Sequence, residues 1–179
     1  MEKQDFPRFP PLMRVLHWLL AVLLLGMLFI GAAMVTSLSA YHRLLGLHRP
    51  LGAAILVLAV IRLLNRRYSE LPPFPVTMSE RERRIASLSE WLLYGLMIGI
   101  PIVGWAMLSA GHYPIVLCGS LRLPPILPAS PPLYAVLRRT HTVLAYTLFF
   151  AFIAHLSGVL FHTLILRDGL LRRMASWRK

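Results

Sequence analysis

The sequence lacks cysteine almost entirely, since Cys118 is the only one among its 179 residues. A single thiol excludes an intramolecular disulfide bond and a metal site built from several thiolates. It also excludes covalently attached c-type haem, whose attachment requires the motif C-x-x-C-H. Any metal centre in this chain must therefore be held mainly by other side chains.

Charged residues are also scarce, and long stretches of the chain contain none. No Lys, Arg, Asp or Glu occurs between Thr140 and Arg167, for example. A bilayer core about 30 Å thick is crossed by about 20 apolar residues in a helix. Four stretches satisfy that requirement: 13–34, 41–64, 85–110 and 135–166. The sequence therefore predicts an all-α integral membrane protein, a four-transmembrane-helix bundle that forms a single membrane-embedded domain over residues 1–179.

The basic residues indicate how this bundle is oriented. The N-terminal tail, the connection between the second and third spans and the C-terminal tail, each with its flanking helix ends, carry fourteen of the 19 Lys and Arg residues. Because positive loops stay in the cytoplasm, we expect both termini to be cytoplasmic. The net charge of +12 is thus explained by membrane topology and gives no reason to expect nucleic acid.

Acidic residues are missing from the opposite, outer side. All seven lie on the cytoplasmic half: Glu2, Asp5, Glu70, Glu80, Glu82, Glu90 and Asp168. The outer side keeps five arginines: Arg43, Arg49, Arg122, Arg138 and Arg139. Such an uncompensated positive surface attracts small anions or anchors anionic groups. The outer connection between spans 3 and 4 contains six prolines among apolar residues, which predicts a stiff, non-helical loop lying against the membrane interface or over the bundle.

Histidines stand out against this apolar background. Five fall within the predicted spans: His17, His48, His141, His155 and His162. Ionisable side chains inside a membrane are costly and indicate function. The alternating directions of the spans place His17 level with His155 on the inner side, and His48 level with His141 on the outer side. His42 and His112 are expected at the surface.

The last span carries a stripe of these imidazoles. His141 and His155 are separated by fourteen residues, which corresponds to about 21 Å along a helix and about 40° around it. His162 follows seven residues later on nearly the same face. The fourth helix therefore contributes one imidazole to each of two levels, with a third nearer the cytoplasm.

Two facing imidazoles at each of two depths are typical of bis-histidine haem iron, which helix bundles hold without cysteine. Each of the four paired histidines also has a small residue about one turn further on: Ala21, Gly52, Ala145 and Gly158. His162 is followed by Ile165 and Leu166 instead. A zinc site would require three or four ligands at one level. A proton relay could use spaced membrane histidines but would not require matched pairs.

Four short segments in order carry a family resemblance: "RVLHWL", "LHRPLG", "RTHTVLAY" and "IAHLSGVLFH". With the four spans, they make the chain resemble the bacterial cytochrome b561 family, four-helix dihaem proteins of the inner membrane. The resemblance implies two b haems, bound by His17 with His155 and by His48 with His141. It also implies electron transfer to the quinone pool. Some members resemble an enzyme that oxidises superoxide outside and reduces ubiquinone, and others are subunits of larger oxidoreductases.

We therefore expect a superoxide:ubiquinone oxidoreductase in which electrons cross the membrane. His162 is expected to hydrogen-bond or protonate a quinone, with Glu90 as a second proton source on the same side. Arg49, Arg138 and Arg139 are expected to pair with haem propionates or to steer superoxide.

Two alternatives remain open at this point. One is a non-autonomous electron-transfer subunit that docks a periplasmic or membrane redox partner and passes its electrons to quinone. The other is a proton-conducting or transport protein without haem. A reduced-minus-oxidised spectrum would separate the second alternative from the haem proteins.

Overall fold

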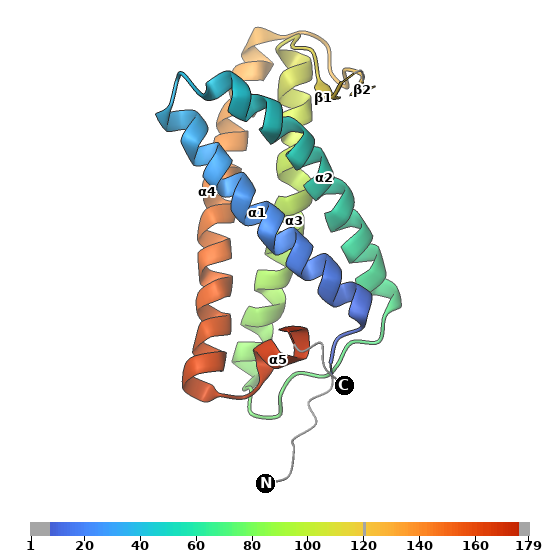
Figure 1. Cartoon of the computed structure of the whole chain (residues 1–179), viewed down its shortest axis with the longest axis vertical. Coiled ribbons are helices and arrows are strands. Elements are labelled where there is room, and N and C mark those ends of the chain that lie inside the picture. The colour runs from blue at the N-terminus through green and yellow to red at the C-terminus, as the bar shows by residue number, and fades with distance from the viewer. Residues whose placement is uncertain (1–7, 120, 176–179) are drawn as a thin grey trace.

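The structure is a computed structural model that describes residues 8–119 and 121–175 (Figure 1). The acidic residues Glu2 and Asp5 lie outside this described part. Its helices are α1 Pro11–Thr36, α2 Tyr41–Tyr68, α3 Glu80–Ala110, α4 Pro131–Leu160, the π-helical turn η1 Phe161–Leu166, and α5 Leu170–Ala175. The strands β1 Val116–Cys118 and β2 Leu121–Arg122 pair antiparallel.

Within residues 8–119 and 121–175, four helices are long and apolar enough to cross a membrane: α1, α2, α3, and α4 continued by η1. The predicted bundle of four membrane helices is confirmed. Large apolar side chains such as Val22, Phe29 and Phe150 point outward and are mostly exposed. That arrangement suits a lipid environment, because the acyl chains of lipids are as apolar as these side chains.

Several helices extend beyond the predicted spans, because local capping signals lie outside the apolar stretches. α3 begins at Glu80, where the Ser79 side chain accepts a hydrogen bond from the backbone N–H of Glu82. The Glu82 carboxylate in turn accepts from the Ser79 backbone N–H, which completes a capping box. α4 begins at Pro131 and Pro132, since proline at the first helical positions lacks only a hydrogen bond that would not be made there.

The helices pack in chain order, α1 along α2, α2 against α3 and α3 along α4. Figure 1 shows α1 crossing obliquely in front of α4, with the β1–β2 hairpin at one end of the bundle and α5 at the other. We call these the hairpin end and the α5 end. Within the described residues, α4 packs closely along neither α1 nor α2. The helices that carry the predicted histidine pairs are thus not held together by backbone packing.

A compact apolar core fills the middle of the bundle. All four long helices contribute to it: Leu20, Leu24, Ile55, Ala59, Tyr94, Leu96, Met97 and Leu148. Leu148 lies seven residues, about two helical turns, from both His141 and His155. The core therefore separates two histidine levels along α4.

The connection between α3 and α4 folds back on the end of α3. Trp105 donates its indole N–H to the Pro124 carbonyl oxygen at 2.8 Å, and Ser109 Oγ accepts from the Ile126 backbone N–H at 3.1 Å. Arg49 on α2 donates to the Pro114 carbonyl oxygen at 3.3 Å. The non-helical character expected from the prolines is confirmed, whereas the short β hairpin was not predicted because its strands have only three and two residues.

At the other end, α5 ties the chain's last described segment to the rest of the bundle. Its Arg173 carbonyl oxygen accepts from the Phe9 backbone N–H at 3.2 Å, and the Met174 carbonyl oxygen accepts from the Trp18 indole at 3.2 Å. Arg173 also donates to the carbonyl oxygen of Pro73 in the connection between α2 and α3. These contacts fix the surroundings of the beginning of α1.

Candidate functional site

At the hairpin end, the imidazoles of His48 on α2 and His141 on α4 face each other. Their ring centroids are 6.2 Å apart, and the ring planes are inclined by 64°. The Nδ1 atoms of both rings are buried and lack a hydrogen-bond partner in the described structure. Buried polar atoms are rarely left unpaired, so these two indicate a missing ligand or water.

Gly104 on α3 has no side chain and so leaves room for the imidazole of His141. A Cβ atom added at Gly104 would lie 3.2 Å from Cε1 and 3.5 Å from Nδ1 of the imidazole. The backbone carbonyl of Ile100, one turn earlier, is also close to the ring. Metal-binding histidines commonly direct their second nitrogen toward a backbone carbonyl. The wall of this site is therefore formed by α3 as well as by α4.

Toward the α5 end, His17 on α1 and His155 on α4 lie close enough for their charges to interact. In Figure 1, α1 begins beside the end of α2 and then runs obliquely across the bundle, so that its later part crosses in front of α4. Trp18 stands edge-on to the His17 ring, with 5.5 Å between ring centroids. The structure thus sets His48 facing His141 and places His17 within electrostatic range of His155, at two levels about 21 Å apart along α4.

A buried arginine accompanies the second pair. Arg62 on α2 is only 9% exposed, and its Nη2 lies 3.3 Å from Nδ1 of His17. Its guanidinium stacks over the ring of Tyr94 at 5.0 Å from the centroid. Both Arg62 Nε and the Tyr94 hydroxyl are buried without a hydrogen-bond partner in the described structure.

Glu90 is already engaged by another arginine. Arg66 on α2 donates from Nε and Nη2 to the two carboxylate oxygens of Glu90 on α3, each at 2.8 Å. The guanidinium also lies over Trp91, 5.2 Å from the ring centroid. This bidentate pair joins α2 to α3 and occupies the carboxylate that the sequence analysis considered as a proton source.

His162 forms a close pair with Asp168. The His162 side chain is nearly buried, and its Nδ1 lies 2.6 Å from Oδ2 of Asp168. Asp168 Oδ1 also accepts from the Leu170 backbone N–H at 3.0 Å. The π-helical turn η1 and the left-handed conformation of Arg167, with φ of 52°, fold the chain back so that this contact can form. His162 is thus oriented by a carboxylate and does not project from the helix end.

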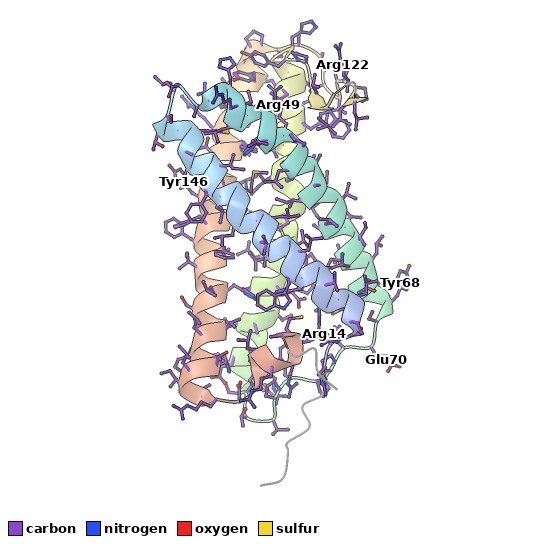
Figure 2. All side chains as sticks on the ribbon, viewed as in Figure 1. Arg14, Arg49, Tyr68, Glu70, Arg122 and Tyr146 are labelled. Carbon is purple, nitrogen blue, oxygen red and sulfur yellow. The ribbon has the colours of Figure 1, made fainter. Side chains whose placement is uncertain are left out.

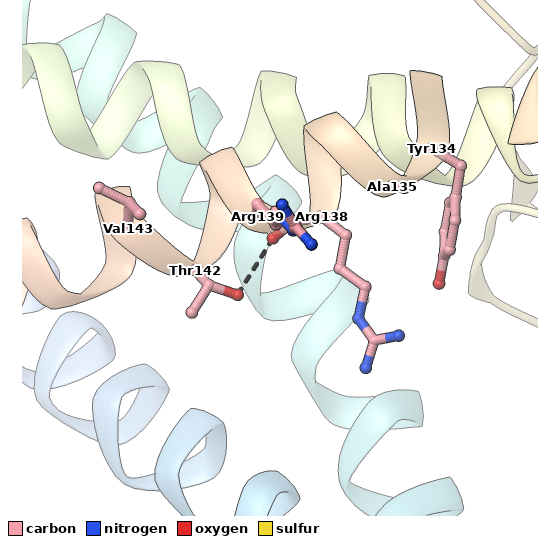
Figure 3. A pocket seen from close by; sticks show the side chains of 6 residues that line it. All are labelled: Tyr134, Ala135, Arg138, Arg139, Thr142 and Val143. Carbon is pink, nitrogen blue, oxygen red and sulfur yellow. Dashed lines mark hydrogen bonds between the residues drawn. The ribbon is translucent and has the colours of Figure 1, made fainter. Parts of the chain in front are cut away.

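The arginines at the hairpin end are placed differently from one another. Figure 2 shows Arg49 and Arg122 at this end, whereas Arg14 and Glu70 lie toward the α5 end. Arg138 and Arg139 are exposed and line an open hollow of about 490 Å³ beside α4. In Figure 3, Tyr134 and Arg138 extend from the same side of α4, and Thr142 donates to the Arg138 carbonyl oxygen at 3.0 Å. His42 and His112 are exposed, as predicted.

The donor sets fit iron held by two imidazoles. In the described part of the chain, no group of three or more His, Cys, Asp and Glu side chains is placed to hold a metal ion. Metal–imidazole bonds of about 2 Å on each side of one ion leave ring centroids about 6 Å apart. The spacing of His48 and His141 matches this value. The neighbouring Gly104 and the loose packing of α4 against α1 and α2 suit a flat group between helices.

The family model of the prokaryotic cytochrome b561 proteins matches residues 8–177 of this sequence. The chain belongs to the prokaryotic cytochrome b561 family. It is 31% identical to "Cytochrome b561 homolog 2" of Escherichia coli (strain K12) over 171 residues, which cover 93% of this chain and 90% of the relative. It is also 31% identical over 128 residues to "Probable superoxide oxidase CybB" of Yersinia pestis, covering 72% of each chain.

Membership of the cytochrome b561 family establishes the general role of the chain. It is a multi-pass protein of the bacterial inner membrane, a haem b protein and an electron-transfer protein of the oxidoreductase type. The resemblance stated from the four sequence segments is confirmed.

Four residues of this cytochrome b561 site were missed by the sequence analysis: Arg62, Tyr94, Gly104 and Asp168. The first three lie on α2 and α3, and their relation to the histidines depends on how the helices are rotated against each other. A single sequence does not contain that information. Asp168 had one usable signal, because it is the only carboxylate after Glu90 and follows His162 by six residues.

Proposed function

We propose that this cytochrome b561 protein binds two b haems and carries electrons across the membrane, from superoxide at the hairpin end to ubiquinone at the α5 end. The observation that carries the proposal is that His48 faces His141 on α4, while His17 lies within electrostatic range of His155 further along the same helix. His48 with His141 would hold one haem, and His17 with His155 the other. A haem held by two imidazoles would supply single-electron exchange at each site.

The positive surface of the hairpin end supports an anionic donor. Arg138 and Arg139 are exposed beside α4, one turn or less before His141. Among the described residues, all acidic side chains lie in the chain segments that are assigned to the cytoplasmic side of the membrane. Uncompensated charge of this kind raises the encounter rate of an anion by about 10- to 1,000-fold. Superoxide delivers one electron and leaves as dioxygen, so it leaves no bulky product.

Arg49 has a different part in the proposal. It follows His48 directly, and one of its nitrogens donates to the Pro114 carbonyl while Nε is buried without a partner. The side chain therefore holds the outer loop near the first haem site and retains one donor for a haem propionate. Arg138 and Arg139, which are open to water, are better suited to attracting superoxide.

At the α5 end, His162 and Asp168 supply what quinone reduction requires. Ubiquinone takes up two electrons and two protons to become ubiquinol, so each quinone consumes two superoxide ions. A protonated imidazole can give up a proton from one nitrogen while a carboxylate holds the N–H of the other nitrogen and fixes the ring. Asp168 therefore orients His162 so that Nε2 is the nitrogen offered to a quinone oxygen. Proton donation by Glu90 would require it to leave its ion pair with Arg66, so we assign Glu90 to holding α2 and α3 together.

The direction of electron flow rests on the expected orientation. Fourteen of the 19 basic residues are assigned to the cytoplasmic side, which places the α5 end inside and the hairpin end outside. Superoxide would then react in the periplasm, and the protons for ubiquinol would be drawn from the cytoplasm. The relative named as a probable superoxide oxidase is consistent with this direction.

The second candidate function is an electron-transfer subunit. The loop between α3 and α4 is anchored to α3 and α2 and carries Tyr113 and Leu121 exposed on the hairpin end. Such an ordered surface next to exposed arginines suits the docking of a periplasmic or membrane redox partner. In that case, electrons would enter from the partner and not from superoxide.

A stopped-flow measurement on the purified protein in detergent or nanodiscs separates the two functions. The oxidised protein is mixed with a pulse of superoxide, and haem reduction is followed with and without ubiquinone. The proposal predicts rapid reduction by superoxide alone and formation of about one ubiquinol for two superoxide ions. Slow reduction that a partner protein accelerates would support the subunit function instead.

A further inference from the structure

Arg62 is a buried cation that the described structure does not neutralise. Its side chain is only 9% exposed within a membrane helix, and in the described part of the chain it contacts no carboxylate. The nearby carboxylate, Glu90, is fully engaged by both donors of Arg66. Arg62, Arg66 and Glu90 together therefore carry one excess positive charge. A buried charge without a partner is strongly unfavourable, so it calls for an anion.

The one polar contact of Arg62 cannot persist if His17 binds a metal. A guanidinium only donates hydrogen bonds, so the 3.3 Å contact requires a lone pair on Nδ1 of His17. A neutral imidazole that binds a metal through Nε2 carries its proton on Nδ1, and one that binds through Nδ1 has used that lone pair. In either case, Arg62 loses its acceptor.

Tyr94 presents a second unpaired donor at the same place. It is 2% exposed, and its hydroxyl has no hydrogen-bond partner in the described structure. The Arg62 guanidinium lies over its ring at 5.0 Å. Two buried donors, one of them charged, thus stand next to His17 and share the same need for an acceptor with negative charge.

We propose that Arg62 and Tyr94 bind a carboxylate of the haem held by His17 and His155. This inference rests on the proposed function, because it requires a haem at that pair. A haem propionate supplies both the acceptor oxygens and the negative charge that the two side chains lack. The pairing fixes which edge of the haem points toward α2 and α3. Replacing Arg62 by a neutral side chain would leave that carboxylate unbalanced beside His17 and so would disfavour the reduced form of the haem.

The experiment compares haem with haem dimethyl ester, in which both carboxylates are blocked. His48→Ala protein is used as the background, so that only the site at the α5 end is filled. The apoprotein is produced in haem-deficient cells and loaded with either group. Dissociation into an excess of a soluble haem-binding protein is then timed for the parent and for Arg62→Gln. Arg67→Gln serves as the control, since it removes the same charge from an exposed position on the same helix.

If Arg62 and Tyr94 hold a haem carboxylate, the dissociation rates of haem and its dimethyl ester should differ between the variants as follows. Arg62→Gln should lose haem about 10 to 100 times faster than the parent, as expected for a charge-assisted hydrogen bond. The dimethyl ester should dissociate rapidly from the parent and no faster from Arg62→Gln. Tyr94→Phe should show a smaller change of the same kind, and Arg67→Gln none. In the two-haem protein, Arg62→Gln should lower the midpoint potential of one haem only.

Other outcomes would overturn the assignment. If haem and its dimethyl ester dissociate equally slowly from the parent, no carboxylate is bound there. If Arg62→Gln accelerates the loss of both groups equally, its role is limited to packing or to His17. If Arg62→Gln does not accumulate, Arg62→Lys and Tyr94→Phe are compared with the parent, and equal haem and ester dissociation in both would refute the proposal. If the parent protein binds no haem at all, the proposed function is refuted instead. Haem binding by the parent is therefore measured before any Arg62 variant is tested.

Discussion

Gly104 on α3 lies directly against the imidazole of His141 on α4, where an added Cβ would stand 3.2 Å from Cε1. A methyl group at this distance forces the ring to move by a few tenths of an ångström. Because His141 is a proposed haem ligand, we predict that Gly104→Ala weakens haem binding at the hairpin end. Overpacking costs about 1–3 kcal/mol, which corresponds to haem loss about 5- to 150-fold faster. The rate of haem loss from each site is measured by following the absorption bands of the two haems separately.

Gly99 provides the matched control for this substitution. It lies on the same helix, and an added Cβ would meet no atom within 4 Å. Alanine is a better helix former than glycine by about 1 kcal/mol, so Gly99→Ala should retain both haems and slightly raise thermal stability. If Gly104→Ala and Gly99→Ala lose haem at the same rate, the close approach of Gly104 to His141 does not affect haem binding.

Substitution of the His162–Asp168 pair should slow quinone reduction without removing haem. His162→Asn and Asp168→Asn both take away the oriented proton donor, and general acid catalysis contributes about 100- to 10,000-fold. The rate of ubiquinol formation from the reduced protein, measured between pH 6 and 9, is the readout. Haem content should stay at the parent value in both variants. Loss of a haem from His162→Asn would mean that the ligand assignment is wrong.

The exposed arginines of the hairpin end should make the reaction with superoxide depend on salt. We predict that Arg138→Gln combined with Arg139→Gln lowers the second-order rate by about 10-fold at low ionic strength. The difference should disappear near 1 M salt, where charges are screened within about 3 Å. Arg172→Gln, an exposed substitution at the α5 end, should leave the rate unchanged. A rate for the parent protein that does not vary with salt would contradict steering.

Glu90→Gln separates a structural role from a proton-transfer role. The substitution leaves the Arg66 guanidinium without its bidentate partner, so we expect a lower apparent melting temperature. The pH profile of quinone reduction should stay as in the parent, because the proton donor assigned here is His162. A fall of about 10-fold or more in quinone reduction, with stability retained, would instead identify Glu90 as a proton source.

The sequence predicted the helices well because their cause is local. Long apolar stretches without charge can only be membrane helices, and alternation of direction then matches residues near the same side. That reasoning pairs His17 with His155 and His48 with His141 from the sequence alone. It placed the ends of α3 and α4 less well, since the Ser79 capping box and the prolines at 131 and 132 lie outside the apolar stretches.

The residues that surround the histidines could not be predicted in the same way. The approach of Gly104 to His141 and of Arg62 to His17 depends on rotation and tilt between helices, which hydrophobicity does not encode when every face of a helix is apolar. The turn that brings Asp168 to His162 depends on a π-helical segment followed by Arg167 in a left-handed conformation. Regular α-helical geometry, which the sequence analysis assumed, ends at Leu160.

Four histidines form two haem sites in the proposed arrangement, and counting haem in histidine variants is the decisive measurement. A reduced-minus-oxidised spectrum with a haem-to-protein ratio should give two haems for the parent chain. Each of His17→Ala, His48→Ala, His141→Ala and His155→Ala should reduce the ratio to one, with the same haem lost within each pair, while His162→Ala should keep two. A ratio near one or zero for the parent chain, or loss of different haems within a pair, would contradict the account.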